Sequence, residues 1–147
     1  MNYTSVKAFF EGLATDNGWG FAHNSEHLHT DINNNKNWKG KLILTMDEPR
    51  GTFRYAAEQW NDSPAYGFWL HRPVDQNDWA KEDEYYQASK TALETIIMAE
   101  INEQMENESG IWQYFDGVID YRKSGPMLTE RLFGIYVSIG TRDVVEL

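Results

Sequence analysis

Near its C-terminal end the sequence reads LFGIYVSI, over residues 132–139. Ile135, Val137 and Ile139 alternate with a tyrosine and a serine, which is the two-residue period of a β-strand. The pattern predicts a strand with one apolar face. A strand of this kind needs partners in a sheet, so the segments before it decide the fold class.

Two elements are expected directly before this strand. An aromatic-rich segment at 111–119 predicts a neighbouring strand, joined to it by a loop at Lys123–Pro126. A long helix is expected from about residue 76 to about 107, capped by Asp75, Asn77 or Asp78. Its apolar stripe consists of Trp79, Tyr86, Leu93, Ile97, Ile101 and Met105.

The first half of the chain predicts one short helix and four strands. The helix carries Val6, Phe9, Phe10 and Leu13 on one face, with Thr4 or Ser5 as its cap and Asn17-Gly18 at its end. Alternation then predicts strands at 27–32, 42–46, 53–57 and 66–71. Turn-forming residues at 47–51 and 61–64 separate the last three, so that 42–46 and 53–57 form a hairpin.

This order of elements predicts an α+β fold in a single domain, residues 1–147. A mostly antiparallel sheet, made of the meander and two C-terminal strands, packs with the short N-terminal helix and the long helix. Several strands have large side chains on both faces, so we expect the second face of the sheet to be covered as well.

Composition excludes several classes of function. The net charge of −10 argues against a DNA-binding surface or docking on anionic lipid, because both need basic groups. The chain has no cysteine, which removes disulfides, thiol catalysis and cysteine zinc sites. No basic and apolar leader opens the sequence and no apolar run approaches about 20 residues, so we expect no secretory signal and no membrane span.

One histidine group has the residue types of a metal site. On a strand, His27 and His29 lie on one face and Asp31 continues it, a set that Zn²⁺ or non-haem iron can bind. The alternative is a polar strand face without metal. We favour the polar face without metal, because the His-Glu-x-x-His spacing is missing. We therefore expect no metal and no other cofactor.

Other catalytic motifs are also missing from the sequence. It has neither a Gly-x-Ser-x-Gly elbow nor a phosphate-binding Gly-x-x-x-x-Gly-Lys loop, so we expect no enzyme and no catalytic residues. The long helix is acidic, with Glu94, Glu100, Glu103 and Glu106 as candidates for a negative face. Such a face is either a solvated surface or a contact for a basic partner.

The aromatic content of 14% is high. Aromatic residues are enriched at protein interfaces, and Trp60, Trp69 and Trp112 are the candidates for an assembly interface. The alternative is that these tryptophans pack at the rim of the core.

The element order resembles that of the tail-terminator and neck proteins of tailed bacteriophages. The closing strand with its early glycine, Gly134, is similar to the final strand of such proteins, and the amphipathic helix before Trp112-Gln113-Tyr114-Phe115 occupies the same place. The loop from Gly18 to Asn37 has no counterpart that we can match to this family.

The resemblance implies a structural virion protein, made in the host cytoplasm, with no active site. Such proteins form a ring, commonly a hexamer, that caps the tail tube and joins it to the neck and head connector. DNA passes through the ring, where a negative wall would reduce sticking. The alternatives from other classes are a small acidic inhibitor, such as an immunity or DNA-mimic protein, and a metal enzyme that uses His27, His29 and Asp31.

Overall fold

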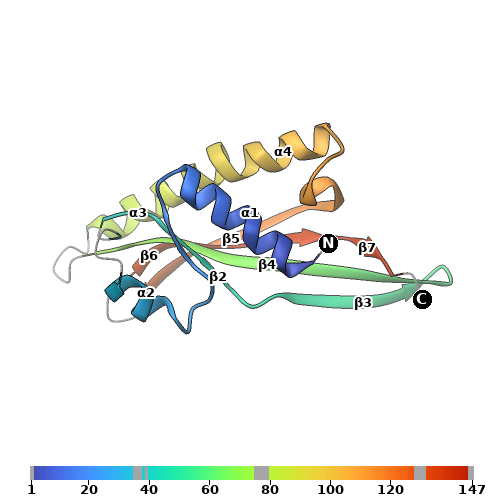
Figure 1. Cartoon of the computed structure of the whole chain (residues 1–147), viewed down its shortest axis with the longest axis horizontal. Coiled ribbons are helices and arrows are strands. Elements are labelled where there is room, and N and C mark those ends of the chain that lie inside the picture. The colour runs from blue at the N-terminus through green and yellow to red at the C-terminus, as the bar shows by residue number, and fades with distance from the viewer. Residues whose placement is uncertain (1, 35–37, 39, 75–79, 128–131, 146–147) are drawn as a thin grey trace.

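The computed structural model describes residues 2–34, 38, 40–74, 80–127 and 132–145 (Figure 1). One helix comes first, a second lies between the first two strands, and a long helical segment separates the first four strands from the last three. The elements are α1 (Tyr3–Asp16), β1 (Gly20–Ala22), α2 (Leu28–Asn34), β2 (Ile43–Met46), β3 (Arg50–Ala56), β4 (Gln59–Pro73), α3 (Lys81–Ala92), a π-helical turn (Leu93–Ile97), α4 (Met98–Glu106), a 3₁₀ turn (Ile111–Tyr114), β5 (Phe115–Met127), β6 (Leu132–Thr141) and β7 (Asp143–Val144).

The described strands form one mostly antiparallel sheet, which confirms the α+β class. Their order is β1-β2-β4-β6-β5, and β3 and β7 pair with the outer half of β4. β1 pairs with β2 in parallel and the other pairs are antiparallel. The long strand β4 is therefore paired on both sides, by β2 and β3 on one and by β6 and β7 on the other.

The hairpin lies elsewhere than predicted. β2 does not pair with β3, because both run along β4, with Met46 opposite Phe68 and Arg50 opposite Ala65. Four steps along β2–β3 thus match three along β4, so the segment 47–49 is a bulge and not a turn. The hairpin turn is Ala57-Glu58, and the turn predicted at 61–64 is part of β4.

α1, α3 and α4 lie on one face of the sheet, the helix-covered face (Figure 1). There Phe10 of α1 packs against Phe68 of β4 and Trp112 of the 3₁₀ turn, with ring centroids 4.6 and 5.8 Å apart. The core also contains the buried side chains of Ile135, Val137 and Ile139. This confirms the apolar face predicted for the closing strand.

The opposite face of the sheet, the second face, is covered in part. α2 lies across one end of it (Figure 1), where Leu28 packs with Ala22, Ile43 and Leu132. Farther along, every described residue of β3 is exposed. The expectation of a covered second face is therefore confirmed only near α2.

The predicted strand at 27–32 is wrong, because residues 28–32 belong to α2 and His27 directly precedes that helix. The Asn24 side chain accepts a hydrogen bond from the His27 backbone N–H at 3.0 Å, and the Asp31 N–H donates to the His27 carbonyl. Leu28 and Ile32 are four residues apart, so one helical face brings both to the second cluster of buried side chains.

The long helix is confirmed from Lys81 to Glu106. Its predicted caps and Trp79 lie outside the described residues. Leu93, Ile97 and Ile101 are buried and lie four residues apart. The wider π-helical turn at Leu93–Ile97 suits this spacing better than an α-helix with 3.6 residues per turn would.

Two smaller predictions are corrected at the ends of elements. α1 is capped by Asn2, whose side chain accepts from the Ser5 N–H, and not by Thr4 or Ser5. The loop predicted at Lys123–Pro126 belongs to β5, where the strand is irregular between Ser124 and Met127.

Candidate interaction surfaces

The hypothesis that His27, His29 and Asp31 bind a metal depended on a strand, which the structure does not have at these residues. His27 precedes α2, and His29 and Asp31 lie on it, so the same-face argument from a strand no longer applies. Within the residues described, no group of three or more His, Cys, Asp or Glu side chains is placed to hold a metal ion.

The three candidate tryptophans have different environments. Trp112 is fully buried and contacts Phe9 and Phe10, so the prediction of an interface role for it is wrong. The sequence placed it at an element edge, but the 3₁₀ turn carries it into the core. Trp69 is half-buried on the second face, with its ring centroid 5.0 Å from that of Tyr136.

Trp60 belongs to an exposed aromatic group on the β3–β4 hairpin, which extends beyond the helices (Figure 1). Phe53, Tyr55 and Trp60 are 66, 59 and 42% exposed. Tyr55 lies opposite Trp60 in the register, and their ring centroids are 5.3 Å apart. Because alternation is unbroken along β4, these three side chains share the side of the helix-covered face. We call them the aromatic hairpin patch.

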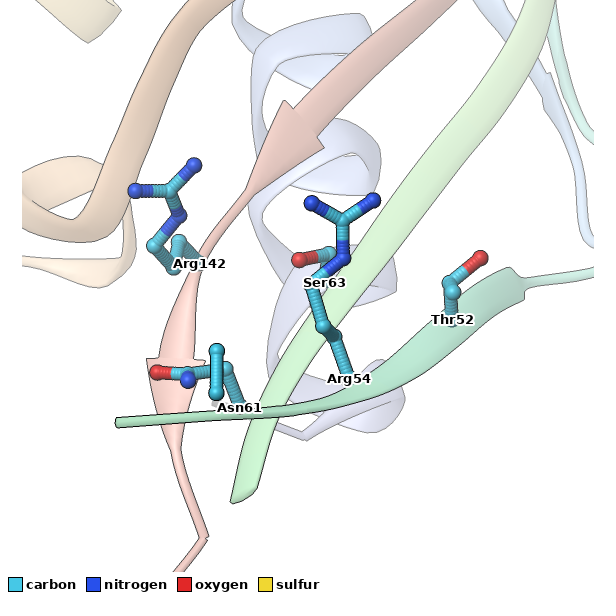
Figure 2. Close-up of a pocket in the computed structure, with 6 residues that line it drawn as sticks. Thr52, Arg54, Asn61, Ser63 and Arg142 are labelled. Carbon is cyan, nitrogen blue, oxygen red and sulfur yellow. The ribbon is translucent and has the colours of Figure 1, made fainter. Parts of the chain in front are cut away.

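The other side of the same hairpin is basic and polar. A pocket of about 500 Å³ is lined by Thr52, Arg54, Ala56, Asn61, Ser63 and Arg142. In Figure 2 their side chains lie in front of β3 and β4, with α1 behind the strands. The register agrees, since Arg54 is opposite Asn61 and Thr52 is opposite Ser63. We call this hollow the arginine pocket.

The described part of the chain has other hollows as well. Asp116 and Asp143 line one of about 420 Å³ on another side of Arg142. Beside the long helix, Met98 and Met105 of α4 and Ile119 of β5 line a shallow hollow of about 310 Å³.

The four acidic candidates of the long helix lie toward solvent. Glu94, Glu103 and Glu106 are exposed and Glu100 is half-buried. Glu106 accepts a hydrogen bond from the Asn102 side-chain amide at 3.3 Å. In the part of the chain that the structure describes, no Lys or Arg forms an ion pair with these carboxylates.

Two groups on the second face have strongly shifted pKa values. Burial lowers the pKa of His71 to about 3, and its Nε2 lies 2.9 Å from the Thr45 hydroxyl. Burial, together with a hydrogen bond that its hydroxyl donates to Asp47 Oδ2 at 2.7 Å, raises the pKa of Tyr136 to about 12. Both shifts favour the neutral side chain, and in the described residues neither group belongs to a cluster of three or more His, Cys, Asp or Glu side chains that could hold a metal ion.

Sequence reasoning missed Phe53, Tyr55, Arg54 and Arg142 as surface residues of interest. Phe53, Arg54 and Tyr55 alternate along one predicted strand, with the aromatic side chains on one side and the arginine on the other. This alternation was a usable signal of two different surfaces. Arg142 has no such local signal, because only the pairing of β4 with β6 and β7 brings it to the hairpin.

None of the helices described has both the length and the apolar run that crossing a bilayer requires. In sequence, the chain matches no known protein-family profile and no curated protein.

Proposed function

We propose that this protein is a ring-forming structural subunit of the tail-terminator type, which caps a phage tail tube and joins it to the neck. The observation that supports the proposal best is the aromatic hairpin patch. Exposing three large aromatic side chains to water on a projecting hairpin is unfavourable in free energy. Contact with another chain would bury them and remove this penalty.

The arrangement favours assembly over catalysis. The patch lies at one end of the molecule, on a hairpin paired into the sheet through β4, so it is presented on a firm support (Figure 1). A contact between this patch and a different surface of the next copy is heterologous, and heterologous contacts form a ring when the rotation between copies closes. The order of elements, as in the resembling family, favours a ring at the tail end over other assemblies.

The first experiment is negative-stain electron microscopy of the purified protein, with light scattering on the same sample. We expect rings with a central hole, alone or at the ends of tubes formed by a cognate tail-tube protein. The variant Phe53→Ser/Tyr55→Ser should remain folded by circular dichroism and lose the rings.

Tyr121→Ser is the matched control, because Tyr121 is 47% exposed but lies on β5, at the other edge of the sheet. Rings that survive in the hairpin variant would show that the patch is not the contact. A wild-type protein that stays monomeric and caps no tube would overturn the proposed function.

A second candidate function, an acidic inhibitor, is favoured by the exposed carboxylates of Glu103 and Glu106. It requires salt-sensitive binding to a basic protein and loss of that binding in Glu100→Gln/Glu103→Gln/Glu106→Gln. The variant Phe53→Ser/Tyr55→Ser separates the two functions, because it should lose the rings, whereas an acidic inhibitor with the same substitutions should keep its salt-sensitive binding to the basic protein.

A further inference from the structure

The arginine pocket has the chemistry of an oxyanion site. The polar side chains that line it are two guanidinium groups, two hydroxyls and one amide, and no carboxylate is among them. All of these groups can donate hydrogen bonds, and a guanidinium fork matches the two oxygens of a carboxylate or phosphate. In a chain of net charge −10, such a donor-rich hollow is a local exception.

Arg54 is available for such a ligand. Within the described part of the chain, no carboxylate lies at ion-pair distance from its guanidinium, and it shows no side-chain hydrogen bond. Figure 2 shows the Arg54 side chain extending from β3 across the strand that carries Ser63, with Arg142 approaching from the segment after β6.

The acidic surface of the same chain cannot reach this pocket. Glu103 and Glu106 lie on α4, over the helix-covered face, whereas the pocket opens on the second face. The sheet separates the two charged surfaces within one molecule. A head-to-tail contact between two molecules can bring them together.

We propose that the arginine pocket of one copy binds glutamate carboxylates of α4, from Glu103 and Glu106, in the next copy of the ring. This inference rests on the proposed function and specifies its contact. Charge complementarity favours this occupant, because the pocket offers two guanidinium groups, and Glu103 and Glu106 are exposed carboxylates with no ion pair among the described residues.

DNA phosphate is the competing occupant and is less well matched. Binding of duplex DNA draws its affinity from many neutralised phosphates, whereas the pocket offers two arginines and Asp116 lines the adjoining hollow. Repulsion between the net charges of two copies is screened beyond about 8 Å at physiological ionic strength, so local pairs decide the contact.

The test is a charge exchange measured by sedimentation of the full chain. Arg54→Glu/Arg142→Glu should weaken self-association by about tenfold or more, and Glu103→Lys/Glu106→Lys should do the same. Combining all four substitutions in one chain restores opposite charges at every contact, so association should return to within about threefold of wild type. Lys7→Glu/Lys41→Glu changes the net charge equally and controls for it.

Each other outcome has a distinct meaning. If wild type and Arg54→Glu/Arg142→Glu assemble equally well, or if the combined variant is not restored, the inference is wrong and the ring proposal stands. The inference also fails if a short DNA duplex binds wild type, the arginine variant loses that binding, and self-association is unchanged. A wild type that neither self-associates nor caps tubes overturns the proposed function and this contact with it.

Discussion

A single buried imidazole should make the stability of this fold depend on pH. His71 lies on β4 with 1% of its surface exposed, and burial lowers its pKa to about 3. Its Nε2 lies 2.9 Å from the Thr45 hydroxyl, a contact that the neutral ring makes. In the unfolded chain the same ring takes up a proton near its ordinary pKa of 6.5.

The sign follows from which state binds more protons. Between pH 6.5 and 3 the unfolded chain holds a proton on His71 that the folded chain does not, so the free energy of unfolding falls as pH falls. The fall is about 1.4 kcal/mol per pH unit well below 6.5, which amounts to about 2 kcal/mol at pH 5. Above pH 6.5 the effect is absent.

The assay compares wild type with His71→Gln by urea denaturation at pH 7 and pH 5. Glutamine is neutral at both pH values and can still bond to Thr45, while the many carboxylates contribute equally to both proteins. Wild type should lose about 2 kcal/mol more than the variant on acidification. Equal losses, or a His71 ring that NMR shows to be protonated at pH 5 in the folded protein, would refute the reasoning.

Other substitutions test the packing of the sheet and its hairpin. Gly134→Ala should destabilise the fold by about 3 kcal/mol in thermal denaturation, because a Cβ there collides with the Leu70 carbonyl, whereas Gly12→Ala, at an exposed position of α1 with open space for a Cβ, should stabilise it by about 1 kcal/mol. Tyr136→Phe removes its 2.7 Å hydrogen bond to a carboxylate and should cost about 1.5 kcal/mol in urea, and a spectrophotometric titration of wild type should place this tyrosine's pKa near 12. Ala57→Asn/Glu58→Gly should raise stability by about 1 kcal/mol in the same urea assay, because φ is +53° and +60° at these turn positions; an unchanged midpoint would contradict this account of the turn.

The sequence predicted the elements whose pattern is long and regular. The stripe at Leu93, Ile97 and Ile101 spans three turns, and the alternation at 135–139 spans a whole strand, so each period is unambiguous. The α+β class follows from these elements. The short segment at 27–32 carries only two apolar residues, Leu28 and Ile32, whose spacing fits a helix and a strand alike, and there the prediction was wrong.

The hairpin escaped sequence reasoning for a local reason. Its turn is Ala57-Glu58, which lacks the glycine and asparagine that mark such turns. Pro64 instead looked like a turn, yet it lies inside β4, where its carbonyl accepts a hydrogen bond from the Thr141 hydroxyl at 3.0 Å.

Of the surface candidates, the exposed acids of the long helix and the exposure of Trp60 agree with the sequence reasoning, and Trp112 does not. The arginine pocket could not be predicted, because Arg54 and Arg142 meet only through the register of separate strands.

The unbroken run of β4 has a mechanical consequence. This strand extends from the hairpin turn into the centre of the core, and its pairing with β6 has no register shift, while the bulge at 47–49 lies in its partner on the other side. Swinging the hairpin would require opening the ladder between β4 and β6, which also holds buried side chains. A neighbour that docks there meets a pre-organised surface, so little conformational freedom is lost on binding. Force applied to the tip of the hairpin would be carried along β4 into the centre of the sheet.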